Sequence, residues 1–463
     1  MKTESKFSQG ARKRRKRRRP ARSNPLDRSA PEYEHLRALS SLLPEDRVRE
    51  LAKSTGLIRR ERKIDPVAIL WVLVLGFGVR LQTDLAALNR EYRRRTGVEL
   101  SDGSWYERFT PQLSAFLRES AVLAIERLAA EARGKLGDRL KQFKDLMIQD
   151  STVIRLHEKL ANVFPATRAR GVAAGAKVSL LISAVANGPK KVAVSGERTA
   201  DVKMLTIGPW VKDCILLVDL GYYKYQLFAR IAENGGYFVT RLKDNANPLI
   251  VASHAVHRGR AIDVAGKQWQ EVLLLLRRRV TDIVVEISFS RRKYRGKGSR
   301  DTMLVRLVAV WNEEARQYHV YLTNIAPDVL DAEEVADLYV CRWEIELTFK
   351  ALKSHYALDR VKSTSRHVVE ALIWTALLTM LVSRRYYNFI RSITPKRDRP
   401  RLTRLRWAKV FAEGAQITLH NILWYLGLAR TPWEAGMLEQ EVKRSQALDP
   451  HINRKRMLNG WVA

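Results

Sequence analysis

The chain has 463 residues, enough for two or three domains, and 46% of them are apolar, so each part can bury a core. Its 83 Lys and Arg residues against 49 Asp and Glu give a net charge of +34, which favours a polyanionic partner, nucleic acid before a membrane surface. The only two cysteines, Cys214 and Cys341, argue against a disulfide framework or a cysteine-based zinc site and fit a reducing cytoplasm.

No membrane segment is predicted. The longest apolar runs, 66–79 and 371–383, are shorter than the roughly 20 residues that span a bilayer, so we interpret both as buried helices. The charged N-terminus has no apolar stretch or small-residue cleavage site after it, so no signal peptide is expected either.

Residues 1–30 are predicted to form a disordered basic tail, because residues 12–19 are an unbroken run of eight Lys and Arg. Such a tail either contacts DNA phosphates or is a solvated leader without a specific role, and we favour weak DNA contact.

Residues 31–143 have a helical pattern and are predicted to be an all-α DNA-binding domain. Helices are expected at 44–54, 82–96 and 111–134, with a further helix starting near Pro66. This domain either holds a helix-turn-helix, with residues 104–110 near its reading end, or is a plain helical bundle.

The pattern changes to alternating strands and helices at Asp145. The Asn187-Gly188 pair is a strong hairpin signal, and helices are expected at 200–207 and 224–233, after the third and fourth strands. The strands are predicted at 146–156, 177–185, 190–195, 214–220 and 237–243. The predicted order is that of the ribonuclease H-like fold: three antiparallel strands, then a helix, a strand, a second helix and a last strand. The fold class is therefore α/β.

Residues 248–325 interrupt this order and are predicted to be an all-β insertion. Its strands are expected at 269–279, 283–292, 302–311 and 317–323. An exposed basic loop at 291–300 joins two of them. Helices are predicted again at 332–355 and 366–390, so the ribonuclease H-like core comprises 144–247 and 326–385, followed by a helical C-terminal region at 386–463.

Two acidic residues stand in the predicted sheet, Asp150 within the first strand and Asp219 near the end of the fourth. These strands are neighbours in the ribonuclease H-like order, so the carboxylates would meet. Metal-assisted phosphoryl transfer needs such paired carboxylates, because hard cations prefer oxygen ligands. Taken singly, an exposed charge at a strand end explains each residue at least as well.

Tyr339, Arg342, Glu346 and Lys353 fall on one predicted helix, within roughly 60° of one another at 100° per residue. An ordinary surface helix with an Arg342–Glu346 ion pair would have the same spacing. Glu344 competes with Glu346 as a carboxylate, but it points about 200° away on the helix and we discount it.

The spacing Tyr339-x2-Arg342-x3-Glu346-x6-Lys353, in the run YVCRWEIELTFKALK, resembles the Tyr-Arg-Glu-Lys signature of bacterial insertion-sequence transposases. These enzymes are members of the DDE superfamily, in insertion-sequence family four. The runs QDST, VDLGYY and FVTRLK, at 149–152, 218–223 and 238–243, resemble the surroundings of the family's two catalytic Asp residues. The resemblance spans about 42–382.

The resemblance implies a DNA transposase that cleaves transposon ends and transfers the strands into target DNA by cut and paste. Asp150, Asp219 and Glu346 would hold two Mg²⁺ or Mn²⁺ ions. The implied partners are double-stranded DNA, as terminal inverted repeats and target, and a second copy of the chain, in a bacterial cytoplasm at the nucleoid. The candidate DNA contacts are Tyr339, Arg342, Lys353, Arg241, Arg291, Arg292 and Lys293.

Some relatives stack a flipped base on a Trp in the insertion, where this chain has His319. Tyr318 or Trp311 would have to substitute for it, or the hairpin step differs. Two other functions stay open from the sequence: an inactive, DNA-binding relative that regulates transposition, and a basic RNA-binding structural protein.

Overall fold

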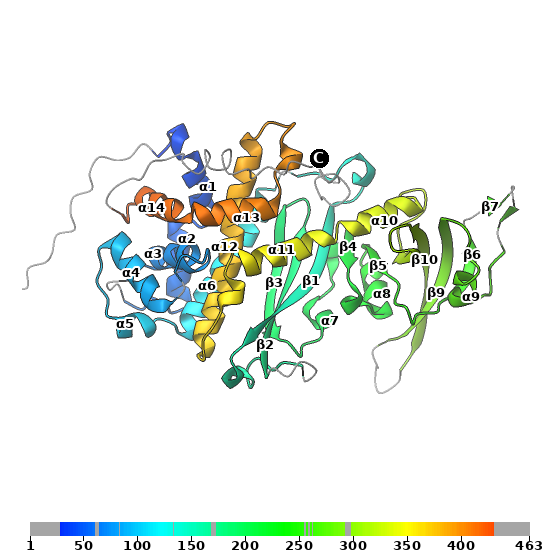
Figure 1. The fold of residues 1–463 in the computed structure, drawn as a ribbon, viewed down its shortest axis with the longest axis horizontal. Coiled ribbons are helices and arrows are strands. Elements are labelled where there is room, and N and C mark those ends of the chain that lie inside the picture. Colours follow the sequence, from blue (N-terminus) through cyan, green and yellow to red (C-terminus); the bar gives the residue numbers. More distant parts are fainter. Residues whose placement is uncertain are drawn as a thin grey trace, which may run out of the picture.

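The computed structural model describes residues 28–429, except 61–63, 83, 133, 168–172, 254–255, 258–259, 262 and 292–297. The predicted tail at 1–30 lies almost wholly outside the described residues. Figure 1 shows an elongated molecule in which helices from both ends of the chain gather at one end, a sheet fills the middle, and long strands form the other end.

The N-terminal region is helical, as predicted. Asp65 caps the third helix by accepting hydrogen bonds from the Val67 and Ala68 amides, with Pro66 in the first turn. Gly97 ends the fourth at a φ of 70°, which glycine adopts without strain. The helices are α1 (Glu34–Leu42), α2 (Glu45–Ser54), α3 (Pro66–Val72), α4 (Leu85–Thr96), α5 (Asp102–Tyr106) and α6 (Pro111–Ala130).

A nine-stranded mixed sheet runs through the molecule in the order β3-β2-β1-β4-β5-β11-β10-β9-β6. Strands β1, β2 and β3 are antiparallel neighbours, and β4 is parallel to both β1 and β5. Helices α7 (Asp201–Met204) and α8 (Tyr225–Glu233) lie between strands. The strands are β1 (Asp145–Leu156), β2 (Ala174–Ser183), β3 (Gly188–Gly196), β4 (Cys214–Val218), β5 (Tyr237–Arg241), β6 (Leu249–Ser253), β9 (Val280–Ser290), β10 (Arg300–Asn312) and β11 (Gln317–Thr323).

The insertion continues the central sheet, because β11 pairs with β5. The strand predicted at 269–279 is wrong: α9 (Trp269–Leu273) lies there, so the insertion is not all-β. Trp269 and Val272, three residues apart, are buried on one face of that helix. Leu274 and Leu275 after it are 80% and 71% exposed, so the apolar run that suggested a strand is only partly buried. A separate pair, β7 (Val256–His257) and β8 (Arg260–Ala261), completes the insertion.

The helix predicted at 332–355 is two helices, α10 (Ala332–Val340) and α11 (Trp343–Ser354). Asp331 and Glu334 form a reciprocal capping box at the start of α10. The Cys341 and Arg342 amides bond to carbonyls three residues back, which tightens the turn between the helices. Three helices follow: α12 (Arg366–Ile393), α13 (Arg404–Glu413) and α14 (Ala415–Tyr425).

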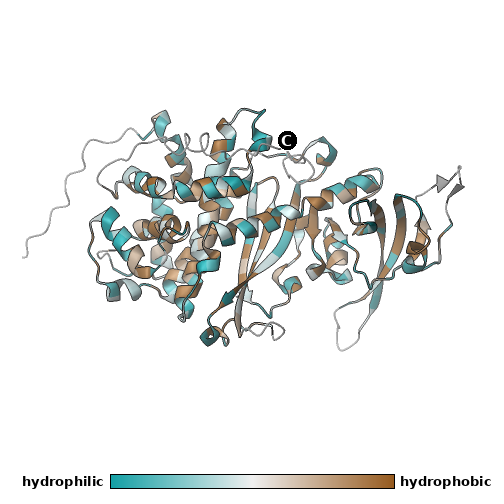
Figure 2. Cartoon of the chain, in the orientation of Figure 1, coloured by the Kyte–Doolittle hydropathy of each residue, from teal (hydrophilic) through white to brown (hydrophobic). Residues whose placement is uncertain are grey.

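Two hydrophobic cores lie on opposite faces of the sheet. Ile148 belongs to the core under the N-terminal and C-terminal helices, and its neighbour Met147 belongs to the core under α8 and the insertion. Figure 2 shows the apolar residues concentrated on the strands and on inward-facing helices. Among the described residues, α12 is the one helix with the length and hydropathy of a membrane span, but 78% of its apolar window is buried within the protein. Both long apolar runs are therefore buried helical segments, as predicted.

Candidate active site

Asp150 and Asp219 occupy equivalent positions on two neighbouring parallel strands. Gln149 of β1 pairs with Val218, the last residue of β4; Asp150 is the next residue of β1, and Asp219 directly follows β4. Because paired strands lie about 4.8 Å apart, this register places the two acidic residues side by side, as the predicted strand order required.

The side chain of Asp150 is only 19% exposed. Burial, together with the negative charges of Asp219 and Glu346, raises the pKa of Asp150 to about 6. The Ser151 amide and Arg342 favour the charged carboxylate and partly offset this rise in pKa. Glu346 comes from α11, which packs on β1. Three carboxylates from three separate elements therefore act on one another at this point of the sheet.

Arg342 lies between two of these carboxylates. Its guanidinium is 2.6 Å from the Glu346 carboxylate and 3.6 Å from that of Asp150, and its side chain is only 16% exposed. Its Nε is buried without a hydrogen-bond partner among the described residues. The guanidinium is thus held by charge at the centre of the acidic group.

Tyr339 contacts both Arg342 and the strand end that precedes Asp219. It is 7% exposed, and its hydroxyl donates a hydrogen bond of 3.4 Å to the carbonyl of Val218, the residue before Asp219. The Arg342 guanidinium lies 5.7 Å from the centre of its ring, a cation–π distance. Burial raises the pKa of Tyr339. Its hydroxyl is therefore committed to the strand that carries Asp219.

The remaining candidate DNA contacts differ in their surroundings and in their charge partners. Lys353, at the far end of α11, is half-buried, and burial and the charge of Arg155 lower its pKa. Arg241 ends β5, and its charge acts on Tyr339, so it lies on the carboxylate face. Arg291 is held by Glu233 at 2.5 Å and by Asp301 at 2.7 Å, so its charge is already compensated. Arg292 and Lys293 lie outside the described residues.

The aromatic residues of the insertion divide between the two faces of the sheet. Trp311 and Tyr318 are cross-strand partners with ring centres 5.0 Å apart, and Tyr318 packs on the core under α8. Tyr321 belongs to the opposite core and contacts Tyr339. The suggestion that Trp311 or Tyr318 replaces a base-stacking Trp is therefore wrong for this arrangement, because both face away from the carboxylates. His319 alternates onto the carboxylate face, where burial and Arg241 lower its pKa.

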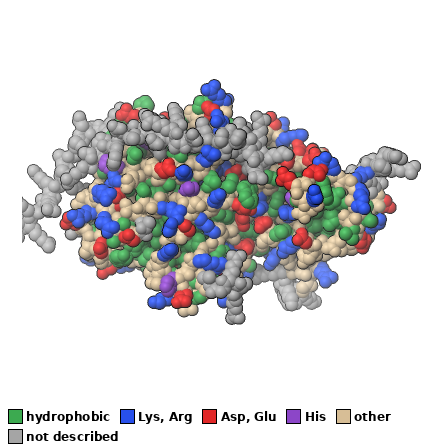
Figure 3. Space-filling view, viewed as in Figure 1, with side chains coloured by type: hydrophobic (Ala, Val, Ile, Leu, Met, Phe, Trp, Pro, Cys, Tyr) green, Lys and Arg blue, Asp and Glu red, His purple; other side chains and the backbone are tan. Residues whose placement is uncertain are grey.

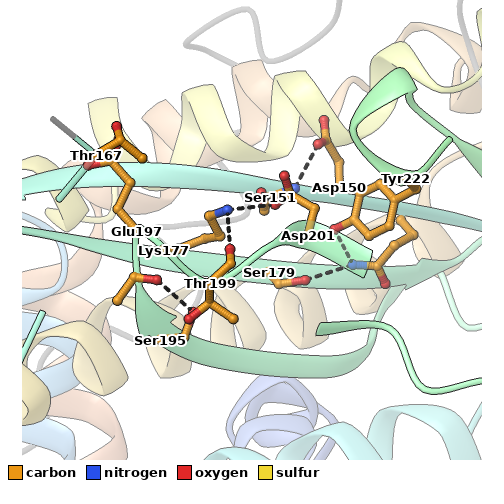
Figure 4. Close-up of polar contacts among 12 residues, drawn as sticks. Asp150, Ser151, Thr167, Lys177, Ser179, Ser195, Glu197, Thr199, Asp201 and Tyr222 are labelled. Atoms are coloured by element: carbon orange, nitrogen blue, oxygen red, sulfur yellow. Dashed lines mark hydrogen bonds and ion pairs between the residues drawn. The ribbon is translucent and has the colours of Figure 1, made fainter. Parts of the chain in front are cut away.

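A polar network lies on the other side of β1, directly behind Asp150. The Ser151 hydroxyl donates to Asp201 at 2.6 Å, and the buried Lys177 ammonium lies 2.9 Å from the same carboxylate. The Asp201 carboxylate also lies against Gly221, two residues after Asp219. Figure 4 shows Asp150 and Asp201 on opposite sides of the strand. Asp201 thus connects the segments that carry both aspartates.

Sequence reasoning missed Asp201, because it stands at the first turn of the short helix α7, where an acidic residue is ordinary. Only the fold places it against β1 and β2. Gln149 adds a second connection on this side by donating to Ser179 at 2.7 Å and to the Tyr222 hydroxyl at 3.0 Å.

The acidic group has the chemistry of a divalent-cation site. Within the described part of the chain, no three His, Cys, Asp or Glu side chains are grouped closely enough to hold a metal ion. Glu346 pairs with Arg342 instead. The donors are all carboxylate oxygens, the ligands that Mg²⁺ and Mn²⁺ prefer, and they already attract one cation, the guanidinium. In ligand chemistry, though not in their spacing in this structure, the residues therefore fit a hard divalent ion.

Comparison with known proteins shows the family of the chain. Residues 141–382 match the family model described as the transposase DDE domain. The transposase of insertion sequence element IS231F from Bacillus thuringiensis subsp. israelensis is 23% identical over 367 residues, covering 72% of this chain and 75% of the relative. That of IS1151 from Clostridium perfringens is 21% identical over 390 residues, 78% of this chain and 81% of the relative. A solved piggyBac transposase synaptic complex with hairpin DNA, 10% identical, has a TM-score of 0.43 over 91% of this chain and 86% of that one.

The family model covers more than half of the chain, so the protein belongs to the DDE-domain transposases. It is a DNA transposase of the bacterial insertion-sequence type, as its signature residues indicated. Transposases of this family use divalent metal ions. Nothing in the comparisons favours the inactive regulator, and family membership sets aside the RNA-binding structural protein.

Proposed function

We propose that this transposase excises and inserts its element by cut and paste, with Asp150, Asp219 and Glu346 as the catalytic carboxylates. The observation that carries the proposal is the convergence of these three residues, from β1, the end of β4 and α11, around the guanidinium of Arg342. Two bound Mg²⁺ or Mn²⁺ ions would activate the attacking oxygen and stabilise the leaving oxygen.

The protein's own residues orient that chemistry. In the absence of metal, Arg342 compensates the negative charge of the carboxylates. Once it separates from Glu346, its planar guanidinium can bind a DNA phosphate through two parallel hydrogen bonds. Tyr339 fixes the strand end before Asp219 through the Val218 carbonyl. Lys353 and Arg241 extend positive charge along the same face, where a phosphate backbone would run.

The same reasoning extends to the fold and to the assembly. The strands lie in the order β3-β2-β1-β4-β5, with β1, β2 and β3 antiparallel and β4 parallel to β1 and β5. This order supports a ribonuclease H-like core at 144–247 and 326–385. We assign DNA recognition to the helical region at 31–143. Its target would be the double-stranded terminal inverted repeats of the element. Both element ends must be cut together, so the active form on DNA is a homodimer at the nucleoid.

The test is cleavage of a DNA fragment that carries the element's own ends, taken from the DNA flanking the gene. Reactions with Mg²⁺, Mn²⁺ and EDTA are compared for the natural protein, Glu346→Gln and the matched control Glu333→Gln, an exposed acid on α10. Metal-dependent cuts that leave 3′-hydroxyls, lost only in Glu346→Gln, are expected. Cleavage that persists in Glu346→Gln would refute the assignment of the triad.

A further inference from the structure

A cavity of about 620 Å³, whose lining includes none of the three carboxylates, lies between α1, α6, the β2–β3 hairpin and the C-terminal end of α12. Five arginines converge on it, one from α1 and four from residues 385–404. They are Arg37, Arg385, Arg391, Arg399 and Arg404. Of the described residues that line the cavity, only Glu34 and Glu131 are acidic.

Two of the arginines have acidic partners. Arg385 lies 2.5 Å from Glu131, and Arg404 lies 2.5 Å from the buried Glu344 of α11. These two guanidinium charges are compensated within the protein, and they hold the walls of the cavity in place.

The other three arginines have no acidic partner among the described residues. Arg37 donates to the carbonyls of Arg28 and Ala30, and Arg399 donates to those of Ser392 and Thr394. Carbonyl oxygens fix the directions of these guanidinium groups but do not neutralise their charge. The cavity therefore presents oriented, uncompensated positive charge.

Arg391 is the least satisfied of the five. Its Nε is buried and has no hydrogen-bond partner in the part of the chain that the structure describes. Burial lowers its pKa, and so do the neighbouring charges of Arg404 and Arg399. The side chain as a whole is partly buried. A partly buried cation among other cations is stabilised when an anion joins it.

We propose that this cavity binds a backbone phosphate of DNA, at a point separate from the catalytic carboxylates. Guanidinium forks match phosphate oxygens in geometry and charge, and the chain acts on DNA. The assignment deepens the proposed function, since it names a second place where the DNA is held.

The distance to the candidate active site suits one bound duplex. The β2–β3 hairpin begins at Ala184, whose amide bonds to the carbonyl of Leu146 on β1. Asp150 is four residues further along that strand, about 13 Å at 3.3 Å per residue. That length equals about four nucleotides along one DNA strand, so a single duplex reaches both places.

The test measures DNA affinity against salt with the full chain, in EDTA, on a fixed duplex. Arg399→Gln and Arg391→Gln are compared with Arg397→Gln, a side chain that is 87% exposed in the same loop and outside the cavity. The slope of log K against log salt should become shallower by about 0.9 in the two cavity variants relative to Arg397→Gln. Equal slopes in all three variants would overturn the proposal.

A second arm separates DNA from free anions. Inorganic phosphate, at the ionic strength of a chloride control, should raise the Tm of the natural protein and not that of Arg399→Gln. Phosphate stabilisation with unchanged DNA slopes would assign the cavity to a free anion and refute the DNA assignment. Because EDTA prevents cleavage, the result is independent of the triad: Glu346→Gln should keep the natural slope.

Discussion

The guanidinium of Arg342 lies 2.6 Å from the carboxylate of Glu346, one turn away along the chain, and it occupies the side of Glu346 that faces Asp150. The charge that stabilises the acidic group in the absence of metal is therefore supplied by the protein. A divalent ion that binds there must compete with this guanidinium, so the position of Arg342 opposes metal binding.

Arg342→Gln is expected to bind Mn²⁺ more tightly than the natural protein, by about fivefold, because roughly 1 kcal/mol of competing ion pairing is removed. DNA cleavage should nonetheless fall by about a hundredfold, since the proposed contact between Arg342 and a DNA phosphate is lost. Mn²⁺ affinity is measured by the electron paramagnetic resonance signal of the free ion. Arg342→Lys keeps the charge and should leave Mn²⁺ affinity near the natural value. Weaker Mn²⁺ binding in Arg342→Gln would mean that the guanidinium organises the carboxylates for metal.

Glu344 and Glu346, two residues apart, are expected to fail in opposite ways. Glu344 is buried and pairs with Arg404 at 2.5 Å, whereas the Glu346 side chain is 33% exposed at the acidic group. Glu344→Gln should lower the free energy of unfolding by about 2–4 kcal/mol, because it leaves Arg404 without its charge partner. Glu346→Gln should leave stability nearly unchanged and abolish cleavage. Urea denaturation measures the stability of both variants, and the cleavage assay measures their activity. A Glu344→Gln variant that is stable but inactive would mean that Glu344, and not Glu346, is the catalytic residue.

Most of the catalytic core was predictable because its signals are local. Hydrophobic periodicity and the Asn187-Gly188 turn located β1 to β5, and their order placed Asp150 beside Asp219. The signature on α11 selected Glu346 over Glu344, and the structure agrees that Glu344 points elsewhere, toward Arg404.

The remainder depends on contacts between distant segments, which no local pattern reports. The apolar run at 269–279 reads equally well as a strand or a helix, and only packing makes it α9. The turn at Cys341 and Arg342 has no Gly or Pro to announce it. Asp201 becomes significant only when β1 and β2 are paired, and the arginine cavity joins residues more than 300 positions apart. The face drawn in Figure 3 shows Lys and Arg side chains spread widely, so composition alone could not indicate that cavity.

Asp201 is expected to act as a positioning residue for the two aspartates. Asp201→Asn removes the charge partner of the buried Lys177 and weakens the contact with Ser151, so cleavage should slow by about tenfold. The free energy of unfolding should fall by about 1–3 kcal/mol. DNA affinity should not change, because none of these groups faces the carboxylate side.

The double variant Asp201→Asn with Lys177→Met separates positioning from stability. Removing the unpaired ammonium should restore much of the lost stability, but cleavage should stay slow, because Ser151 is still poorly held. If rate and stability recover together, Asp201 contributes only to folding.

His35 gives the fold a dependence on pH that is separate from catalysis. Its ring is 5% exposed and stacks on Tyr386 with centres 5.9 Å apart, and burial lowers its pKa to about 4. The unfolded chain, with an ordinary histidine pKa near 6.5, therefore binds more protons than the folded protein between about pH 6.5 and pH 4. Stability from this group is complete above that window and is lost as the pH falls through it.

The expected loss is about 1 kcal/mol at pH 5.5 and about 3 kcal/mol at pH 4, at 1.36 kcal/mol per pKa unit. Other groups titrate in the same range, so the measurement is the difference between the natural protein and His35→Phe, which keeps an aromatic ring against Tyr386. Urea unfolding at pH 7.5 and pH 5.5 should show a smaller loss in His35→Phe by about 1 kcal/mol. The same loss in both proteins would mean that His35 is protonated as readily in the folded chain as in the unfolded one.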